Sequence, residues 1–196
     1  SDNGSPCRDG KGMAGATGSV RKLGHNPSEG MRGMKADIWD GGHRVPFIVR
    51  WPGKTPAGKT STEPICSVDL LATLAAVTGY DLPDSTAEDS HNLLDLFTGK
   101  PVGVDAGKVA IRECVIHHSI DGTFCVRQDG WKLIIGNLGS GGFSSPRRVT
   151  PKPRGPKGQL YNLKLDPKET DNLWLKRPEK VAEFTALLDK YKKLGR

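Results

Sequence analysis

The apolar pattern of this chain changes near residue 99, and that change limits the folds open to it. Before it, leucines recur at helical spacing in Ser67–Gly79, and Asn92–Phe97 has the pattern of a second short helix. After it, the apolar runs are short and lie between turn residues, which is typical of antiparallel strands. The pattern predicts an α/β fold over residues 1–99, then a small α+β subdomain with an antiparallel sheet and a terminal helix over residues 100–196.

Local signals place the strands and turns of residues 100–196. Four apolar runs predict strands, at Val109–His118, Thr123–Arg127, Trp131–Ile135 and Gln159–Leu163. The pair Asp129-Gly130 is a strong hairpin signal between the second and third of these strands. Residues 136–158 are rich in Gly and Pro without an apolar pattern, which predicts a long excursion. Pro178 suits the first turn of a closing helix, where the missing N–H costs no hydrogen bond.

Two segments of the first part have a different character. Val45–Trp51 is a short apolar run ended by Pro52-Gly53, which predicts a buried strand of the α/β sheet. This strand has few partners within the chain, so we expect an exposed sheet edge and self-association through it. Residues 5–34 are rich in Gly and lack periodicity. They predict a loop of unusual length, which favours a functional role.

The chain carries a formal net charge of +7, which has two interpretations. Either it serves a polyanionic partner, such as nucleic acid or a sulfated sugar, or it is solvated charge in a loop and at a helix end. The cations gather in two stretches: Arg147, Arg148, Lys152, Arg154 and Lys157, and Lys190, Lys192, Lys193 and Arg196. Aromatic residues do not interleave the first stretch, so the sequence predicts no nucleic-acid partner. No apolar run approaches the ~20 residues that span a bilayer, so it also predicts no membrane span.

The four cysteines, Cys7, Cys66, Cys114 and Cys125, are widely spaced. Without a C-x-x-C or C-x-x-H pair, a zinc site is not expected. Cys114 and Cys125 lie in apolar, strand-like runs that flank a candidate turn. They are either buried thiols or a disulfide, and the sequence leaves both open.

Two motifs near the start of the chain carry residues suited to chemistry. Ser1-Asp2-Asn3-Gly4 offers adjacent oxygen donors, which a hard divalent cation such as calcium prefers. Further along, Lys35 lies five residues before Asp40-Gly41-Gly42-His43-Arg44 and offers a cation for an anionic ligand. Taken singly, the first motif is an ordinary turn and the second an ordinary solvated lysine. The two motifs become informative only when their order along the chain is considered.

In order and spacing, these motifs resemble type I sulfatases, the arylsulfatase family of the alkaline-phosphatase-like superfamily. The resemblance continues through Trp51-Pro52-Gly53 and the helical segment that begins at Ser67. It extends to the hairpin Arg127–Leu133 and to a closing turn at Asp166–Leu173. Because these blocks cover nearly the whole chain, the resemblance implies the C-terminal portion of such an enzyme. It implies a partial mixed sheet with helices, completed by residues 1–99, and the small subdomain of residues 100–196.

The resemblance also implies roles for individual residues. Asp2 and Asn3 would be two ligands of a calcium ion, which polarises the oxygens of a sulfate group. Lys35 would contact a sulfate oxygen and neutralise the charge that builds up as the S–O bond breaks. Asp40 and Arg44 would form a local ion pair. Gly41-Gly42 would supply a backbone conformation that side chains forbid.

The enzymes of this family need a cysteine in a Cys-x-Pro-Ser-Arg or similar motif, which is converted to formylglycine. None of the four cysteines here has that context. The chain alone is therefore expected to be inactive, while its parent would hydrolyse sulfate monoesters, including those of sulfated carbohydrates. Two alternatives stay open: a phosphoryl or phosphonate hydrolase of the same superfamily, and a non-catalytic basic module that binds sulfated glycans through Lys35 and residues 147–157.

His117 and His118 end a predicted strand just before Asp121-Gly122. The end of a strand near a cleft is a favourable place for substrate contacts. The sequence therefore makes both histidines candidate substrate-binding residues, against the alternative of a surface pair in a hairpin. The compartment of the parent protein is left open, with the periplasm, secretion and the lysosome all compatible with the resemblance.

Overall fold

The computed structural model describes residues 3–5, 24–83 and 85–194. The chain divides into two compact units. Unit 1 comprises Ser1–Pro46 and Ile116–Tyr191, and unit 2 comprises Phe47–Val115 and Lys192–Arg196. The boundary at residue 99 concerns the domains of the whole protein and stays a prediction. Cys7 and Asp2 lie outside the described residues.

Unit 1 is built on a four-stranded sheet with the order β1-β2-β3-β4. The strands are β1 (Val115–His118), β2 (Phe124–Gln128), β3 (Trp131–Ile135) and β4 (Gly158–Asn162). Strands β2, β3 and β4 pair antiparallel. Asp129 and Gly130 join β2 to β3 with φ angles of 50° and 82°, as a two-residue hairpin turn with the favoured twist requires. The predicted hairpin is therefore confirmed.

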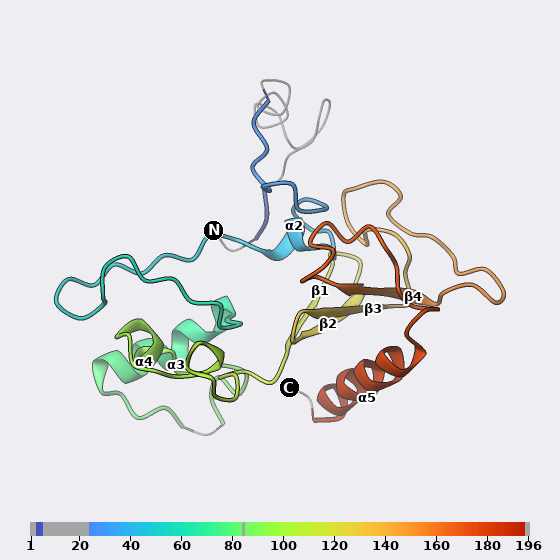
Figure 1. Ribbon diagram of the computed structural model, residues 1–196. Coiled ribbons are helices and arrows are strands. Elements are labelled where there is room, and N and C mark those ends of the chain that lie inside the picture. Colours follow the sequence, from blue (N-terminus) through green and yellow to red (C-terminus); the bar gives the residue numbers. More distant parts are fainter. Residues whose placement is uncertain (1–2, 6–23, 84, 195–196) are drawn as a thin grey trace. The chain divides into compact units, whose positions relative to one another are not determined.

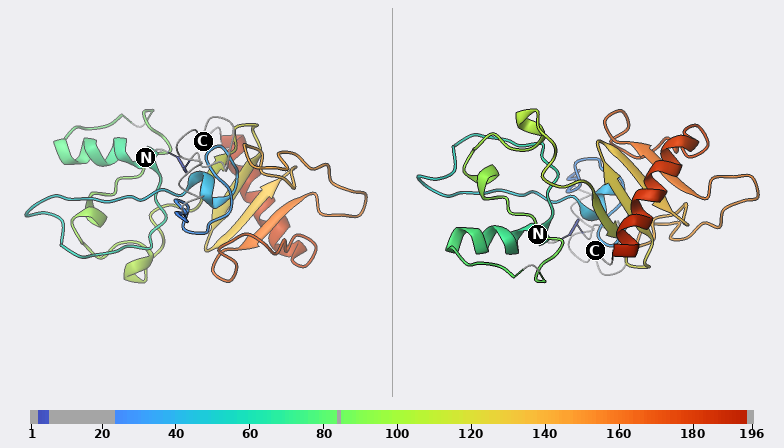
Figure 2. Two further views of the ribbon diagram at one scale, coloured as in Figure 1. Left: turned by 90° about the horizontal axis from the view of Figure 1, so that it is seen from above. Right: turned by 90° about the horizontal axis from the view of Figure 1, so that it is seen from below.

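Different elements lie on the two faces of this sheet. The closing helix α5 (Pro178–Leu194) runs along one face, and the short helix α2 (Asp40–His43) lies over the other (Figures 1 and 2). Successive side chains of a strand point to opposite faces. Val126, Leu133 and Leu160 are fully buried on the α5 side, where Phe184 and Leu188 of the helix are also buried. Both faces are therefore covered, and both are partly apolar.

The α2 face holds a compact apolar cluster together with charged groups. Ile38 and Trp39, just before α2, pack against one residue from each of three strands: Cys125, Ile134 and Tyr161. The same face carries Lys132, which lies two positions before Ile134 in β3 and is completely buried. The segment around α2 is thus fixed on the sheet by apolar contact and by ionic groups.

Unit 2 is mostly irregular. It contains a short 3-10 turn at Ser67–Asp69, helix α3 (Leu70–Thr78), helix α4 (Leu94–Phe97) and a second 3-10 turn at Val104–Ala106. The two predicted helices are confirmed, and Gly79 ends α3 with a φ of 71°, which glycine adopts readily. The predicted strand over Val109–His118 is shorter than expected, because it begins only at Val115.

Val45–Trp51 was predicted as a buried strand, and the structure shows that this is wrong. The segment has no regular structure, and the side chain of Ile48 is 89% exposed. Among the described residues, no strand lies beside it to take its backbone hydrogen bonds. A strand without a neighbour leaves those groups to water, so the apolar pattern alone could not produce one. Self-association through a sheet edge stays a prediction.

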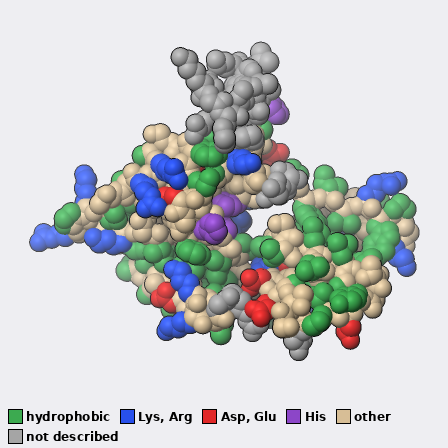
Figure 3. Space-filling model, turned by 180° about the vertical axis from the view of Figure 1, so that it is seen from behind, with side chains coloured by type: hydrophobic (Ala, Val, Ile, Leu, Met, Phe, Trp, Pro, Cys, Tyr) green, Lys and Arg blue, Asp and Glu red, His purple; other side chains and the backbone are tan. Residues whose placement is uncertain are grey.

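Helix α3 leaves its apolar side chains uncovered. Leu70, Leu71, Leu74 and Val77 are all more than a third exposed, and hydrophobic side chains are plainly visible on the face of the molecule that Figure 3 shows. The three described cysteines, Cys66, Cys114 and Cys125, are free thiols. Within the part of the chain that the structure describes, no helix combines the length and the apolar character needed to cross a membrane.

Candidate functional site

The two motifs near the start of the chain lie side by side in unit 1. The backbone N–H of Gly4 donates to the carbonyl of Gly42 at 3.0 Å, and the N–H of Lys35 donates to the carbonyl of Ser5 at 2.9 Å. Gly4 is buried, and a Cβ atom there would overlap the carbonyl oxygen of Gly41. Asn3 therefore precedes a segment that is hydrogen-bonded to the Lys35 motif, while Asp2 falls outside the described residues.

Gly41 and Gly42 are needed for space and not for an unusual backbone angle. Neither has a positive φ, so the expected forbidden conformation is not what the structure uses. A Cβ atom on Gly41 would lie 2.6 Å from the carbonyl oxygens of Arg32 and Gly33, and one on Gly42 would overlap the carbonyl of Asp37. The pair lets three backbone segments approach closely around α2.

Backbone hydrogen bonds on both sides hold the turn that carries Lys35. Ala36 has a φ of 76°, which is uncommon for a residue with a side chain. Its carbonyl accepts from the N–H of Ile120 at 3.0 Å, and the N–H of Ile38 donates to the carbonyl of Ser140 at 2.8 Å. The strained turn is therefore stabilised by the segment after β1 and by the loop after β3.

Asp37 completes this support with its carboxylate. The carboxylate accepts from the N–H of Met34 at 2.9 Å, from the N–H of Ser144 at 3.0 Å and from the hydroxyl of Ser144. Lys35 itself is half-buried, and among the described residues its ammonium group has no hydrogen bond or ion pair. A cation on a fixed backbone, with no partner among the residues that the structure describes, is suited to an anionic ligand.

A buried ionic cluster lies directly behind this turn. The Nζ of Lys132 lies 2.9 Å from Oδ1 of Asp40 and 2.8 Å from Oε1 of Glu169, and all three side chains are almost fully buried. The N–H of Asp40 also donates to Oε2 of Glu169 at 2.8 Å. Arg127 lies 3.3 Å from Asp40, whereas Arg44, the expected partner, is 3.8 Å away and more exposed. The ion pair of Asp40 and Arg44 is therefore present but is the weakest of the set.

The charges of this cluster shift one another's pKa values. Burial opposes the charged form of Asp40, but Lys132 and Arg127 outweigh it and hold the pKa of Asp40 below its usual value. Burial likewise opposes the charge of Lys132, yet Glu169 and Asp40 together raise its pKa. Burial raises the pKa of Glu169, and the nearby negative charge of Asp40 adds to the rise. Lys132 and Asp40 thus stay charged, and Glu169 is the member that takes up a proton first.

The two candidate histidines lie in different environments. The ring of His117 faces that of His43 at a centroid distance of 3.9 Å, and its Nε2 lies 3.4 Å from the carbonyl oxygen of Ile38. His118 is exposed, and its Nδ1 lies 2.8 Å from the carbonyl oxygen of Ser119. Of the two, His118 is the one whose ring can reach a ligand. The substrate-binding role of either residue stays a prediction.

Burial keeps the facing pair of imidazoles neutral. It lowers the pKa of His43 to about 4, and the positive charge of Lys132 adds to the effect. It also lowers the pKa of His117 well below the usual value, with a further contribution from His43. Nε2 of His43 is buried and without a hydrogen-bond partner among the described residues. A proton on either ring would therefore be costly.

Sequence reasoning missed Lys132, Glu169, Asp37 and the loop containing Ser140 and Ser144. One signal was available for Lys132, which is the one charged residue in the apolar run Trp131–Ile135. A charged residue in such a run indicates a buried partner. The partners themselves, Asp40 and Glu169, lie far from it in the sequence, so their identity follows only from the fold.

The donors near Lys35 suit a calcium ion only in part. Asn3 offers an amide oxygen and Asp2 would offer a carboxylate, and both are the hard oxygen ligands that calcium prefers. Within the described residues, no group of three or more His, Cys, Asp or Glu side chains could hold a metal ion. Since calcium takes six to eight oxygens, these two residues can supply only part of a site.

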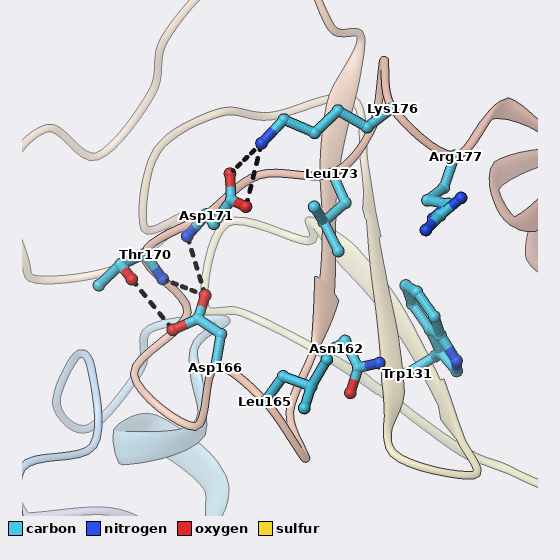
Figure 4. Close-up of a pocket in the computed structure, with 9 residues that line it drawn as sticks. All are labelled: Trp131, Asn162, Leu165, Asp166, Thr170, Asp171, Leu173, Lys176 and Arg177. Atoms are coloured by element: carbon cyan, nitrogen blue, oxygen red, sulfur yellow. Dashed lines mark hydrogen bonds and ion pairs between the residues drawn. The ribbon is translucent and has the colours of Figure 1, made fainter.

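One shallow pocket of about 680 Å³ lies elsewhere in unit 1 (Figure 4). Trp131, Leu165 and Arg177 are among the residues that line it. Its polar groups bond to one another, since Asp166 accepts from the N–H groups of Thr170 and Asp171. None of its lining residues belongs to the two motifs. The pocket therefore offers no reactive arrangement, and the motif region remains the candidate site.

Comparisons with known proteins indicate the family of the chain. The family model described as Sulfatase matches residues 1–80, the segment that contains both motifs. The N-acetylgalactosamine-6-O-sulfatase of Bacteroides thetaiotaomicron is 31% identical over 88% of this chain. The human steryl-sulfatase is 40% identical over 39% of the chain. The chain spans 32% of the length of the first of these relatives and 13% of the second.

Solved structures confirm the fold class. A structure from work on glycosaminoglycan metabolism in Bacteroides thetaiotaomicron aligns with a TM-score of 0.72 and 29% identity, over 90% of this chain and 35% of that one. A sulfatase from Pseudoalteromonas aligns with a TM-score of 0.61 and 22% identity, over 83% of this chain and 33% of that one. The α/β arrangement with a small antiparallel sheet and a closing helix is thus that of sulfatases.

Proposed function

This chain belongs to the sulfatase family, and we propose from that membership that the whole protein hydrolyses a sulfate monoester to an alcohol and inorganic sulfate. The observation that carries the proposal is the pairing of Asn3–Ser5 with Lys35 and Gly42 in unit 1. It brings a candidate metal-binding segment to the place where the Lys35 cation lies. The negatively charged oxygens of a sulfate ester are stabilised by both.

Lys35 has the role of a sulfate contact in this proposal. Its ammonium group stabilises the negative charge that develops on the sulfate oxygens as the ester bond breaks. The hydrogen bonds to Ala36 and Ile38 fix its backbone before the substrate binds, so little reorganisation is needed during the reaction. Asp40 and Lys132 act behind it, by anchoring α2 to the sheet.

Asp2 and Asn3 would hold part of a calcium site. When bound, the ion would polarise the sulfate group and favour attack at sulfur. Further ligands and the formylglycine nucleophile would come from parts of the protein outside this chain, because no cysteine here lies in the required motif. We therefore propose that residues 1–99 complete the catalytic α/β domain, that residues 100–196 form its small subdomain, and that the chain is inactive alone.

The substrate that we propose is a sulfated carbohydrate. The support is the similarity to an N-acetylgalactosamine-6-O-sulfatase over 88% of the chain, whereas the steryl-sulfatase match covers 39%. His118, exposed at the end of β1, would contact the sugar near the ester. His117 is better placed to support α2 through Ile38 and His43. The matches are to sulfatases, so the phosphoryl hydrolase and the non-catalytic module are not favoured.

The test is a Lys35→Ala variant of the complete protein. Loss of one preorganised charge contact should lower kcat for a small aryl sulfate by roughly two or more powers of ten. Lys35→Arg should also be impaired, because a planar fork does not replace a compact ammonium group. Lys54→Ala, which removes an exposed lysine of unit 2, is the matched control and should keep full activity. Full activity of Lys35→Ala at saturating substrate would refute the assignment.

A further inference from the structure

The loop that joins β3 to β4 carries an exposed group of cations. We call residues 146–157 of this loop the basic arm. All five of its charged side chains are positive and exposed: Arg147, Arg148, Lys152, Arg154 and Lys157. No Asp or Glu occurs between Asp129 and Asp166. The loop projects from the sheet in Figure 1, and Lys and Arg side chains gather at that end of the surface in Figure 3.

Most of these charges have no counter-charge in the described part of the chain. Arg148 pairs with Asp121, its Nε lying 2.7 Å from Oδ2. The other four arm cations form no ion pair with any residue that the structure describes. Arginines elsewhere do find carboxylates, as Arg112 does with Asp69 and Arg127 with Asp40. The arm is therefore a local source of uncompensated positive potential.

The backbone of the arm is ordered by hydrogen bonds and by proline. Pro151, Pro153 and Pro156 each fix a φ angle. The N–H of Gly155 donates to the carbonyl of Lys152 at 3.0 Å and closes a turn at the tip. The N–H of Gly136 donates to the carbonyl of Lys157 at 3.1 Å at the base. An arm that is already ordered loses little conformational entropy when it binds a ligand.

The other end of the arm is tied to the loop that supports Lys35. The carbonyl of Arg147 accepts from the N–H of Gly141 at 2.8 Å and from the side-chain amide of Asn137 at 3.1 Å. Arg148 also donates to the carbonyl of Asp121, the residue after Ile120, whose N–H binds Ala36. The arm thus begins next to the elements that hold the candidate site and extends away from them.

We propose that the basic arm binds an extended sulfated polysaccharide at sulfate groups other than the one that is hydrolysed. Arginine can bind a sulfate with two parallel hydrogen bonds, and lysine adds a point charge. Cations spaced along an ordered backbone match sulfates repeated along a polymer. Single-stranded nucleic acid fits less well, because residues 144–157 contain no aromatic side chain on which a base could stack. The choice of a sulfated polymer rests on the proposed function, whereas the binding test below needs no turnover.

The test compares two variants of the full chain that each lose four positive charges. The arm variant carries Arg147→Gln, Lys152→Gln, Arg154→Gln and Lys157→Gln. The control variant carries the exposed changes Arg50→Gln, Lys54→Gln, Lys59→Gln and Arg177→Gln. Both have a formal net charge of +3, four below the +7 of the parent. Both sets of side chains are exposed, so equal melting temperatures are expected and are measured first.

Binding of chondroitin 6-sulfate is then measured by fluorescence anisotropy at low and at physiological salt. The arm variant should lose at least about tenfold in affinity and show a shallower salt dependence, because it releases fewer counterions. The control should stay close to the parent. A second variant with only Lys152→Gln and Arg154→Gln, at the tip, should lose an intermediate amount. This second variant keeps the test valid if the four substitutions together affect folding.

Three results would overturn the proposal. The control could lose as much affinity as the arm variant, which would indicate unspecific charge. Desulfated chondroitin could bind as well as the sulfated form, or single-stranded DNA of equal charge could bind more tightly than either. In the complete enzyme, the arm variant should raise KM for the polymer and leave hydrolysis of a small aryl sulfate unchanged. Arm-dependent binding without any sulfate hydrolysis would contradict the proposed function and leave the arm assignment intact.

Discussion

The two units of this chain bury charged groups in similar ways but differ in what surrounds them. In unit 1, Lys132, Asp40 and Glu169 form a buried ionic cluster on the face of the sheet that also carries an apolar cluster. In unit 2, buried Asp69 accepts from the N–H groups of Cys66 and His91 and pairs with Arg112, with little apolar core around it. Unit 1 therefore has an apolar core on its sheet, whereas in unit 2 a buried carboxylate joins the irregular segments around the short helices.

Exposure of apolar side chains shows the same contrast. Most of the large apolar side chains that are exposed belong to unit 2, including the four on α3 and Ile48. The fully buried ones, such as Leu133, Ile134 and Leu160, belong mainly to unit 1. An apolar helix face without cover is costly in water, because it forgoes the free energy of burial. Unit 1 is therefore expected to contribute most of the stability of the isolated chain.

The largest effect is expected from breaking the buried cluster of unit 1. Lys132→Met leaves Glu169 without its cation in a dry environment and should lower the free energy of unfolding by about 4 kcal/mol. Urea unfolding followed by tryptophan fluorescence measures this. The matched control is Lys100→Met, which removes an exposed ion pair with Asp95 and should change little. Equal effects of the two changes would mean that the cluster does not anchor α2.

Truncation of apolar side chains should lower the free energy of unfolding much more in unit 1 than in unit 2. Leu133→Ala removes a fully buried side chain of β3 and should cost about 3 kcal/mol, through lost transfer free energy and a cavity. Leu74→Ala removes a side chain of α3 that is 56% exposed and should cost under about 0.5 kcal/mol. Chemical denaturation of both variants gives the comparison. A large cost for Leu74→Ala would show that α3 is covered in solution, for instance in a dimer.

A smaller effect is expected from acid, through the facing histidines of unit 1. The pKa of His43 is about 4 in the folded chain, against 6.5 for an unperturbed imidazole, so the unfolded chain takes up a proton first as pH falls. Stability is therefore lost as pH drops from about 6.5 toward 4, by about 2 kcal/mol for His43 between pH 7 and pH 5. His43→Gln with His117→Gln should flatten this dependence in urea titrations. An unchanged slope would contradict the burial of the pair.

Local patterns in the sequence were sufficient for much of unit 1. The Asp129-Gly130 turn, the strands around it and the helix after Pro178 follow from contacts between near neighbours, and the structure confirms them. The prediction of a strand at Val45–Trp51 was wrong because a strand needs a neighbouring strand, and the rest of the fold decides whether one is present. The prediction of an unusual backbone conformation at Gly41-Gly42 was wrong in part for the same reason. The close approach of Gly4 to Gly41 depends on the fold of the chain, whereas an unusual backbone angle would have been local.

The candidate site shows the same division. The sequence alone indicated the family, and it predicted the metal-binding pair Asp2-Asn3 and the sulfate contact Lys35, because these predictions depend on residue type and order. Only the tertiary structure placed Asn3–Ser5 against Gly42 and Lys35, joined Asp40 to Lys132 and Glu169, and turned His117 inward toward His43 while His118 stayed exposed. Hydrogen bonds and ion pairs act over a few ångströms, so residues far apart in the sequence interact only after the chain has folded and brought them together.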